Sequence, residues 1–196
     1  NGRGGAVCLL GGSNPTFTNA SCTGISAYSG GAVWLGDTCS AEFDNATFAA
    51  NQATTGGAFL LSSPGSSIDL ANCVLWGDSP QEIQTSGLVQ VTHSLVQGGY
   101  AGTGNINANP LLGSLQNNGS FTQTLALLPG SPAIDAGDDA NCPATDQRGV
   151  SRPQGSHCDI GAYEYKGQEI PARFPSADFN GDGKTDVAVF RPSNST

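Results

Sequence analysis

The sequence predicts an all-β fold, a right-handed parallel β-helix (a solenoid of stacked coils) with a C-terminal cap and a short extended tail. The first reason is a regular repeat, because Gly4–Leu9, Gly30–Leu35 and Gly56–Leu61 follow one another at equal intervals and share a Gly-Gly-Ala pattern followed by apolar residues. A fixed period with the same local pattern is typical of stacked coils. The second reason is composition, because 12% charged residues and 28 glycines favour turn-rich β structure over a helical bundle.

The first strand of each coil is expected to alternate between the core and an outer face. Successive side chains of a strand point to opposite faces, so Val7 and Leu9 share one face. We place their columns in the core. This leaves Trp34 and Leu60 on the outer face, where an apolar ridge needs a cover or a partner.

A second column of matching segments follows the first. Residues 17–22 match 43–48, and residues 68–73 match them with a shift of one residue. Each coil therefore carries at least two short strands. A coil of this size cannot bury its own apolar face, so equivalent strands are expected to stack in parallel about 4.8 Å apart. Leucine-rich repeats and β-propellers, the competing periodic folds, have other patterns and periods.

The repeat decays after Gly77, and this decay sets the predicted organisation. Residues 87–99 still alternate like a strand and are interpreted as a fourth, irregular coil. The predicted parts are β-helix coils over 1–99, an irregular cap over 100–165 that closes the C-terminal end, a linker over 166–177 and a tail over 178–196. Two prolines and mixed polarity suit an extended linker.

Three C-terminal motifs resemble a known family. They are Leu125–Gly137, Asp146–Gly149 and Cys158–Glu164. They are similar to the C-terminal end of bacterial right-handed β-helix surface proteins, the pectate-lyase-like "choice-of-anchor" family with polymorphic-membrane-protein-type repeats, and the similarity covers roughly residues 4–165. The resemblance implies an exported, cell-envelope or secreted β-helix, usually without demonstrated catalysis.

The tail resembles a second family and carries a candidate calcium loop. Residues 178–192 are similar to the opening of an FG-GAP or VCBS repeat, the unit of integrin-like β-propellers. Oxygen ligands recur at positions 1, 3, 5, 7 and 9 of a tight loop: Asp178, Asn180, Asp182, Lys184 (through its carbonyl) and Asp186. Ca²⁺ prefers six to eight oxygens at such spacing, so we expect a calcium site, with a metal-free turn as the alternative. A second acidic group is interpreted as a solvated turn in preference to a cation site: Asp135, Asp138 and Asp139.

Charge and cysteine content narrow the partners and the compartment. A net charge of −9 disfavours nucleic acids and anionic membranes as partners, because their phosphates would be repelled. Six cysteines and several Asn-x-Ser/Thr triplets indicate an exported protein in an oxidising compartment. No apolar run is long enough to span a membrane. Because the chain begins inside a repeat, we expect a mature product or a fragment, located outside the cell or on its surface.

Cys142 and Cys158 are the predicted disulfide. They flank the Asp146–Gly149 motif and lack the spacing of a metal site. A bridge between them would close a loop of about 16 residues and stabilise the cap by roughly 3 kcal/mol in the chain-entropy model. Cys22 and Cys73 share a column but lie two coils apart, roughly 9–10 Å, which is too far for a bridge. The connectivity otherwise stays open for Cys8, Cys22, Cys39 and Cys73.

Four asparagines begin acceptor triplets for N-glycosylation: Asn19, Asn45, Asn118 and Asn194. Asn19 and Asn45 fall in one column, where a hydrogen-bonded ladder of asparagines inside the turns is the favoured interpretation. Asn118 lies in a polar turn and is the better candidate for a glycan.

Catalysis is disfavoured because the coils lack cationic side chains. No Lys or Arg lies between Arg3 and Arg148, whereas uronate lyases need a basic Lys or Arg and cations that neutralise a carboxylate. A glycoside hydrolase needs two carboxyl groups about 5–9.5 Å apart, and Asp44 and Asp69, one coil apart, are the plausible pair. Two such acids also arise by chance on an acidic surface.

Head-to-tail self-association is the expected partnership. Val187, Val189 and Phe190 belong to a lone tail strand with no propeller to join, and a β-helix that starts within a coil has an open edge. Unpaired edges recruit strands, so we expect the tail to pair with its own solenoid or, by β-augmentation, with the next subunit. The second arrangement builds open filaments. Trp34 and Leu60 are the predicted cover sites for this strand.

The sequence therefore favours a non-catalytic extracellular structural protein, a surface stalk or a self-assembling filament subunit. An adhesin or glycan-binding module is the first alternative, because Trp34 or Trp76 can stack on sugar rings. A polysaccharide hydrolase that uses Asp44 and Asp69 is the second alternative.

Overall fold

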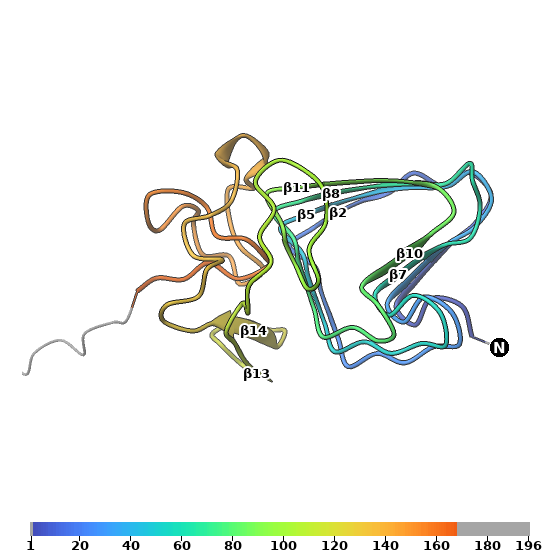
Figure 1. Cartoon of the computed structure of the whole chain (residues 1–196). Helices are drawn as coiled ribbons and strands as arrows, with labels where there is room; N and C mark the ends of the chain where they lie inside the picture. The colour runs from blue at the N-terminus through green and yellow to red at the C-terminus, as the bar shows by residue number, and fades with distance from the viewer. Residues whose placement is uncertain (1, 168–196) are drawn as a thin grey trace, which may run out of the picture. The chain divides into compact units, whose positions relative to one another are not determined.

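The computed structural model describes residues 2–167 and is an all-β solenoid of about three turns, built from parallel stacked coils (Figure 1). This confirms the predicted fold class. The chain divides after Tyr165 into two units, and the first, residues 1–165, contains the solenoid. The predicted linker begins at residue 166, and the tail lies outside the described residues.

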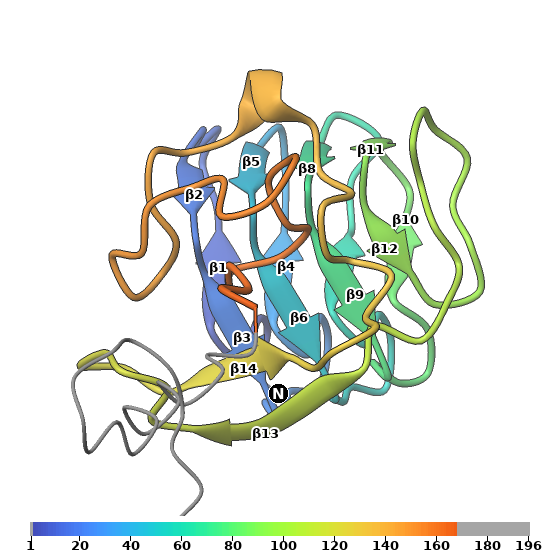
Figure 2. The same ribbon diagram turned by 90° about the vertical axis from the view of Figure 1, so that its left-hand side faces the viewer.

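Three parallel sheets form the walls of the solenoid, and each coil contributes one strand to each sheet (Figure 2). The sequence predicted at least two strands in each coil. The first sheet contains β1 (Val7–Leu9), β4 (Val33–Leu35), β7 (Phe59–Leu61) and β10 (Ile83–Thr85). The second contains β2 (Thr16–Thr18), β5 (Ser40–Asp44), β8 (Ser67–Ala71) and β11 (Leu88–Thr92). The third contains β3 (Ser21–Thr23), β6 (Thr47–Ala49), β9 (Val74–Trp76) and β12 (Leu95–Val96).

The second strand of the third coil is reached one residue later than the regular repeat, whereas the predicted alignment of residues 68–73 with 43–48 placed it one residue earlier. Val33 pairs with Phe59 at the regular interval of the repeat. The interval from Ser40 to its partner Ser67 is one residue longer than this regular interval. The extra residue therefore lies in the loop 62–66. As a result, Leu75 and not Cys73 follows Phe48 in the column that begins at Cys22, which corrects the predicted Cys22–Cys73 column.

The fourth coil is shorter than the others, as the decay of the repeat predicted. The interval from Phe59 to its partner Ile83 is shorter than the regular repeat, and the interval from Ser67 to its partner Leu88 is shorter still. The loops before and after β10 have therefore lost residues, while the parallel pairing continues.

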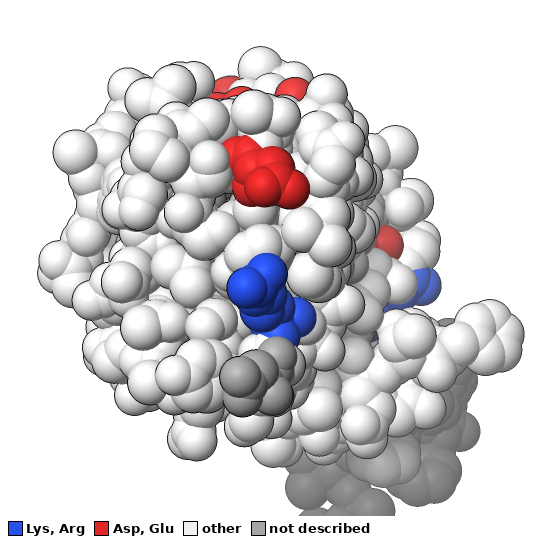
Figure 3. Space-filling model, turned by 90° about the vertical axis from the view of Figure 1, so that its right-hand side faces the viewer, with Lys and Arg blue, Asp and Glu red and all other residues white. Residues whose placement is uncertain are grey.

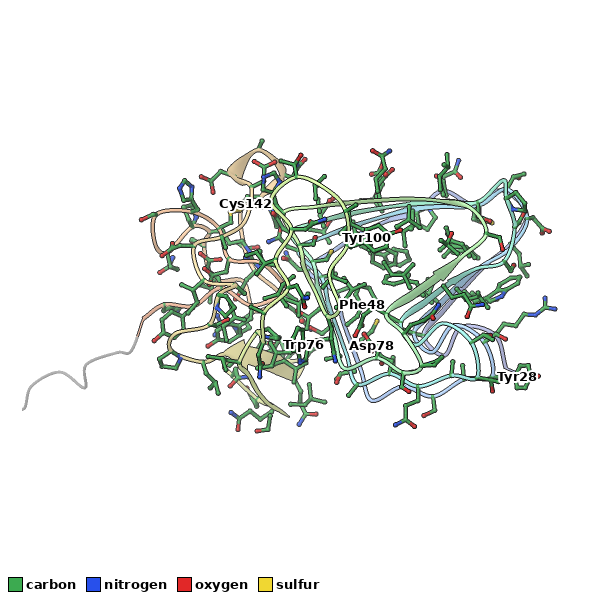
Figure 4. All side chains as sticks on the ribbon, in the orientation of Figure 1. Tyr28, Phe48, Trp76, Asp78, Tyr100 and Cys142 are labelled. Carbon is green, nitrogen blue, oxygen red and sulfur yellow. A yellow bond between two sulfur atoms is a disulfide. The ribbon has the colours of Figure 1, made fainter. Side chains whose placement is uncertain are left out.

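Aromatic rings fill the interior of the coils. Phe43, Phe48 and Phe59 are fully buried and meet edge to face, with ring centroids 4.5–5.4 Å apart. Phe17 stacks on Phe43 with a centroid distance of 4.6 Å. Figure 4 shows Phe48 inside the coil. Val33, Leu35 and Phe59 belong to this core, so the inward direction predicted for the Val and Leu columns is confirmed.

The two glycines of each Gly-Gly pair have different roles. The first glycine, at positions 4, 30 and 56, has φ between 58° and 66°, a left-handed conformation that side chains disfavour. The second glycine allows the coils to approach each other, because a Cβ on Gly31 would overlap the carbonyl oxygen of Gly57 in the next coil. The repeat thus marks both a turn and a close contact between coils.

Substitution of Gly31 by alanine is therefore expected to lower the free energy of unfolding by about 3 kcal/mol, because the backbone of the neighbouring coil must move. Chemical denaturation measures this loss. Gly113→Ala is the matched control, since a Cβ at that position meets only atoms at ordinary contact distances. Equal stability of the two variants would contradict the assigned role of Gly31.

Residues 99–107 stack on the fourth coil at the C-terminal end of the solenoid, where Ile106 forms a parallel bridge with Leu95 and the His93 N–H donates to the Thr103 carbonyl. The chain that follows lies along the side of the solenoid (Figures 1 and 2). It begins with an antiparallel hairpin, β13 (Leu112–Gln116) and β14 (Thr124–Leu127). The flanking segment, residues 133–164, follows with the 3-10 turn η1 (Asp139–Asn141). It bonds to the first, second and third coils, so of the cap predicted over residues 100–165 only the first part lies at the C-terminal end.

A second apolar cluster joins the coils to this part of the chain. Val74 and Leu95 from the third sheet pack with Leu127, Ala133 and Ile160. These five side chains are buried, so the burial of apolar surface stabilises the packing of the hairpin and the flanking segment against the side of the solenoid.

Candidate functional site

A ladder of asparagines occupies the turn between the second and third sheets. Asn19, Asn45 and Asn72 have φ of 56°, 49° and 52°, and His93 takes the equivalent place in the fourth coil with φ of 45°. Asparagine tolerates this left-handed conformation better than most residues. The Asn72 amide donates to Asn45 Oδ1 at 3.3 Å. The ladder predicted for this column is confirmed at Asn45.

The flanking segment bonds to every asparagine of the ladder. Asn19 Nδ2 donates to the carbonyl of Thr145 at 2.7 Å, and Asn45 Nδ2 donates to that of Asp159 at 3.0 Å. Asn72 accepts from the backbone N–H of Asp138 at 2.7 Å and donates to the Asp138 carbonyl at 3.0 Å. These bonds fasten one segment to three successive coils. The Asn45 side chain makes one of these bonds and is fully buried, so a glycan at this candidate position is incompatible with the packing.

A buried ion pair organises the flanking segment itself. Arg152 and Glu164 lie 2.7 Å apart, and neither side chain is exposed. Arg152 also donates to the carbonyls of Asp159 at 3.0 Å and Gly161 at 2.7 Å. Glu164 accepts the backbone N–H groups of Gln154 at 2.7 Å and Asp159 at 3.0 Å. Burial lowers the pKa of Arg152, and the Glu164 charge opposes that change.

Asp146 and Arg148 of the second resemblance motif form a neighbouring pair. The Arg148 Nε donates to Asp146 Oδ2 at 2.8 Å, and its guanidinium lies 3.5 Å from the ring centroid of Tyr163. Asp146 also accepts the backbone N–H groups of Val150 and Glu164, each at 3.0 Å. Asp146, Arg148, Asp159 and Glu164 of the two motifs therefore all make contacts that hold the flanking segment together.

The predicted disulfide between Cys142 and Cys158 is present. It ties the end of η1 to the stretch that carries Asp159 and Ile160. The other four cysteines are free: Cys8, Cys22, Cys39 and Cys73. Burial raises the pKa of the Cys22 thiol to about 11 and that of Cys73 to about 12, so both are unreactive near neutral pH.

The Asp135, Asp138 and Asp139 group has its oxygens occupied by protein donors. Asp138 accepts from the Ala140 N–H at 3.1 Å and caps the 3-10 turn. Asp139 accepts the Cys158 N–H at 2.9 Å and pairs with His157 at 2.8 Å. The bond from Cys158 lowers the pKa of Asp139, and the bond to Asp139 raises that of His157. This arrangement favours the turn interpretation over a cation site.

An acidic groove of 400 Å³ lies on the outer face of the second sheet and is the candidate ligand site. Its carboxylates are Glu42, Asp44 and Asp69, and Asn141 of η1 also lines it. Asp69 pairs with Glu42, whereas Asp44 pairs with Ala71, so Asp44 and Asp69, predicted to be near-equivalent one coil apart, are offset by two residues and line the same groove. Sequence reasoning missed Glu42 because of the inserted residue in the loop 62–66.

The groove changes the proton affinity of two of its carboxyl groups. Burial raises the pKa of Asp44 and of Asp69, and the charge of Glu42 adds to both shifts. Like charges on adjacent parallel strands, about 4.8 Å apart, oppose full ionisation of the group. The arrangement suits a polar ligand that donates hydrogen bonds, such as a sugar hydroxyl.

Trp34 is buried and Trp76 is half-buried. Trp34 does lie on the outer face, but it is only 6% exposed, because its ring packs on Gly36 and beneath the guanidinium of Arg3, 4.7 Å from the ring centroid. Trp76 packs against the apolar cluster beside the flanking segment. This corrects the prediction of Trp34 as an open docking or sugar-stacking surface. Leu60 is half-buried.

Two further predicted glycan sites have different outcomes. The Asn118 amide donates to the Thr124 carbonyl at 2.8 Å and to its hydroxyl at 3.0 Å, so the side chain supports the hairpin. Asn194 lies outside the described residues. The predicted calcium ligands and tail strand lie there too: Asp178, Asn180, Asp182, Lys184, Asp186, Val187, Val189 and Phe190.

The described surface contains few charged side chains. Figure 3 shows a face on which uncharged residues cover most of the area. Among residues 2–167, no cluster of three or more His, Cys, Asp or Glu side chains has the arrangement of a metal site. Within the same range, no helix is long and apolar enough to cross a membrane.

The comparisons with known proteins give one finding. The FG-GAP repeat family matches residues 172–196, which confirms the resemblance predicted for the tail. FG-GAP repeats are usually extracellular. No curated protein and no solved structure matches the chain significantly. The pectate-lyase-like resemblance of the remaining chain stays a prediction from its sequence motifs. The findings support a β-solenoid and an FG-GAP repeat match at residues 172–196.

Proposed function

We propose that this chain is a non-catalytic extracellular structural module in which a clamped solenoid acts as a stiff stalk or filament subunit. The observation that carries the proposal is the set of bonds from the flanking segment to Asn19, Asn45 and Asn72. In a solenoid each coil contacts only its neighbours, so coils at an end open most easily. A segment bonded to three coils opposes that opening and stiffens the stack.

An extracellular location is supported by two independent features. The Cys142–Cys158 disulfide suits an oxidising compartment, and the FG-GAP match belongs to a repeat that is usually extracellular. Calcium bound by the loop 178–186 would order the tail in such a compartment, where calcium is abundant. Calorimetric titration of the full chain with Ca²⁺, and of an Asp182→Asn variant, tests this part.

We propose further that the tail strand around Val187, Val189 and Phe190 joins subunits head-to-tail by pairing with the sheet edge of another copy. The test is removal of residues 170–196, followed by light scattering and electron microscopy with and without Ca²⁺. Filaments of the full chain that disappear on truncation are the expected result. Filaments formed equally by the truncated chain would refute the donated strand, and a full chain that stays monomeric would refute the filament.

A polysaccharide hydrolase is the second candidate, because the acidic groove places Glu42 and Asp69 side by side. Retaining and inverting hydrolases both act through two carboxyl groups. Release of reducing ends from neutral and acidic polysaccharides tests this function, with Glu42→Gln and Asp69→Asn as variants. The structural proposal expects no turnover. Turnover that both variants abolish without loss of folding would replace it.

A further inference from the structure

Two buried carboxyl groups lie where the third coil passes into the fourth. Asp78 and Glu82 are in the turn between β9 and β10, and each is 7% exposed. Figure 4 shows Asp78 on the inner side of the coil. Asp78 Oδ1 accepts from the backbone N–H of Asn51 at 2.7 Å and from its side-chain amide at 2.8 Å. That amide also donates to the Cys22 carbonyl at 3.0 Å, so the group continues into the first coil.

Each carboxyl group has one oxygen that protein donors satisfy and one that they do not. Glu82 Oε1 accepts the backbone N–H of Asp78 at 3.2 Å. Asp78 Oδ2 and Glu82 Oε2 are buried and have no partner among the described residues. The bond from the Asp78 N–H to Glu82 Oε1 holds the two buried carboxyl groups next to each other in the same turn. If both carboxyl groups were ionised, neither could donate a hydrogen bond to the other. Two negative charges would then be buried side by side, which is unfavourable.

Among residues 2–167, no Lys, Arg or His side chain forms an ion pair with Asp78 or Glu82. Two titratable groups face the carboxyl pair, the Cys22 thiol and Tyr100. The Asp78 charge helps to raise the pKa of Cys22. Tyr100 lines a cavity of 240 Å³ beside Glu82. His93, the one histidine of the coils, lies at the asparagine ladder, 3.9 Å from Asp138. A buried negative pair without a cationic partner is neutralised by a proton more readily than it stays charged.

We propose that Asp78 and Glu82 share one proton at neutral pH and that this proton bridges the turn joining the third coil to the fourth. Burial raises the pKa of Glu82 to about 9, and the adjacent Asp78 reinforces the shift. Burial also raises the pKa of Asp78. The inference is independent of the proposed function, because it concerns a group buried away from the acidic groove and from the tail.

The shared proton makes the joint between the two coils stable in acid and labile in alkali. An unfolded Glu82 loses its proton near its ordinary pKa of 4.5, whereas the folded protein keeps the proton until about pH 9. The stabilisation of the folded state by this proton is therefore complete below pH 4.5, and it declines as the pH rises toward 9. One proton retained only by the folded state changes the unfolding constant by about tenfold per pH unit in that window.

Glu82→Gln in the full chain tests the proposal, because the amide keeps the shape and supplies the hydrogen without titrating. Denaturant unfolding from pH 5 to pH 9 should show the wild-type unfolding constant rising by about tenfold per pH unit relative to the variant. Asp37→Asn, in an exposed turn, is the matched control and should follow the wild type. Parallel pH dependences for the wild type and Glu82→Gln would overturn the shared proton.

Infrared spectroscopy gives a readout that does not depend on the variant folding. At pH 8 the wild type should show the carbonyl stretch of a protonated, buried carboxyl group, and the band should disappear as pH passes 9. A spectrum without this band at pH 8 would overturn the proposal. Loss of the band on addition of Ca²⁺, with a rise in melting temperature that Glu82→Gln lacks, would also overturn it, because the pair would then hold a cation.

Discussion

Replacement of Glu164 by alanine is expected to lower the free energy of unfolding by about 3–5 kcal/mol and to release the flanking segment before the coils. The substitution leaves the guanidinium of Arg152 buried without its carboxylate. It also removes the acceptor of the Gln154 and Asp159 backbone N–H groups. An uncompensated buried charge and unpaired buried donors are among the costliest local changes in a protein.

Amide hydrogen exchange of the Glu164→Ala variant locates the effect. Amides of residues 133–164 should lose protection, while those of β4 to β9 should keep most of theirs. His157→Ala is the control, because it removes a pair whose two side chains are about half exposed, and a much smaller change is expected. Uniform loss of protection in the coils and the flanking segment would show that the two unfold as one unit, contrary to this account.

Replacement of Asn72 by alanine is expected to lower the free energy of unfolding by about 3–4 kcal/mol. The Asp138 N–H and carbonyl, whose bonds to Asn72 are part-buried, would each lose a partner, at about 1 kcal/mol each. The alanine would also have to adopt φ near 52°, which costs roughly 1–2 kcal/mol. Thermal and denaturant unfolding of the variant measure the sum of these effects.

Asn72→Gly separates the two causes, because glycine adopts the left-handed conformation freely but has no amide. We expect glycine to recover roughly 1–2 kcal/mol relative to alanine and to leave the remaining loss. If the glycine variant is as stable as the wild type, the backbone conformation alone explains the asparagine at this position. The bonds to Asp138 would then have no role in holding the flanking segment.

The fold could be predicted from the sequence because its main determinants are local and periodic. The regularly spaced Gly-Gly pairs carry both the left-handed turn and the close contact between coils, and the alternation of Val33, Trp34 and Leu35 gives the direction of the core. The inserted residue in the loop 62–66 could not be placed in the same way, because polar turns tolerate a residue anywhere along their length. Glu42, the strand partner of Asp69, was not recognised for this reason.

The lateral position of the flanking segment could not be predicted, because it depends on contacts between residues far apart in sequence. Asn45 and Asp159 are 114 residues apart and meet only in the folded chain. One signal was present in the sequence. A column of asparagines can satisfy only part of its hydrogen-bonding capacity within a ladder, so the remaining donors and acceptors require a further partner. The charged residues of the terminal motifs belong to that partner.

The same reasoning changes the interpretation of the candidate site. Trp34 looked available because alternation placed it on an outer face, but Arg3, from the preceding coil, covers its ring. The open polar surface is instead the groove of Glu42, Asp44 and Asp69, which depends on pairing across coils. Alternation along a strand predicts the face on which a side chain lies, whereas its exposure depends on distant segments.

The central claim, that the flanking segment clamps three coils from the side, is tested most directly by nuclear Overhauser contacts from the side-chain amides of the asparagine ladder. The account predicts contacts from Asn19 to Thr145, from Asn45 to Asp159 and from Asn72 to Asp138 in the same sample. Contacts of residues 133–164 with the fourth coil alone, and none with Asn19 or Asn45, would contradict it.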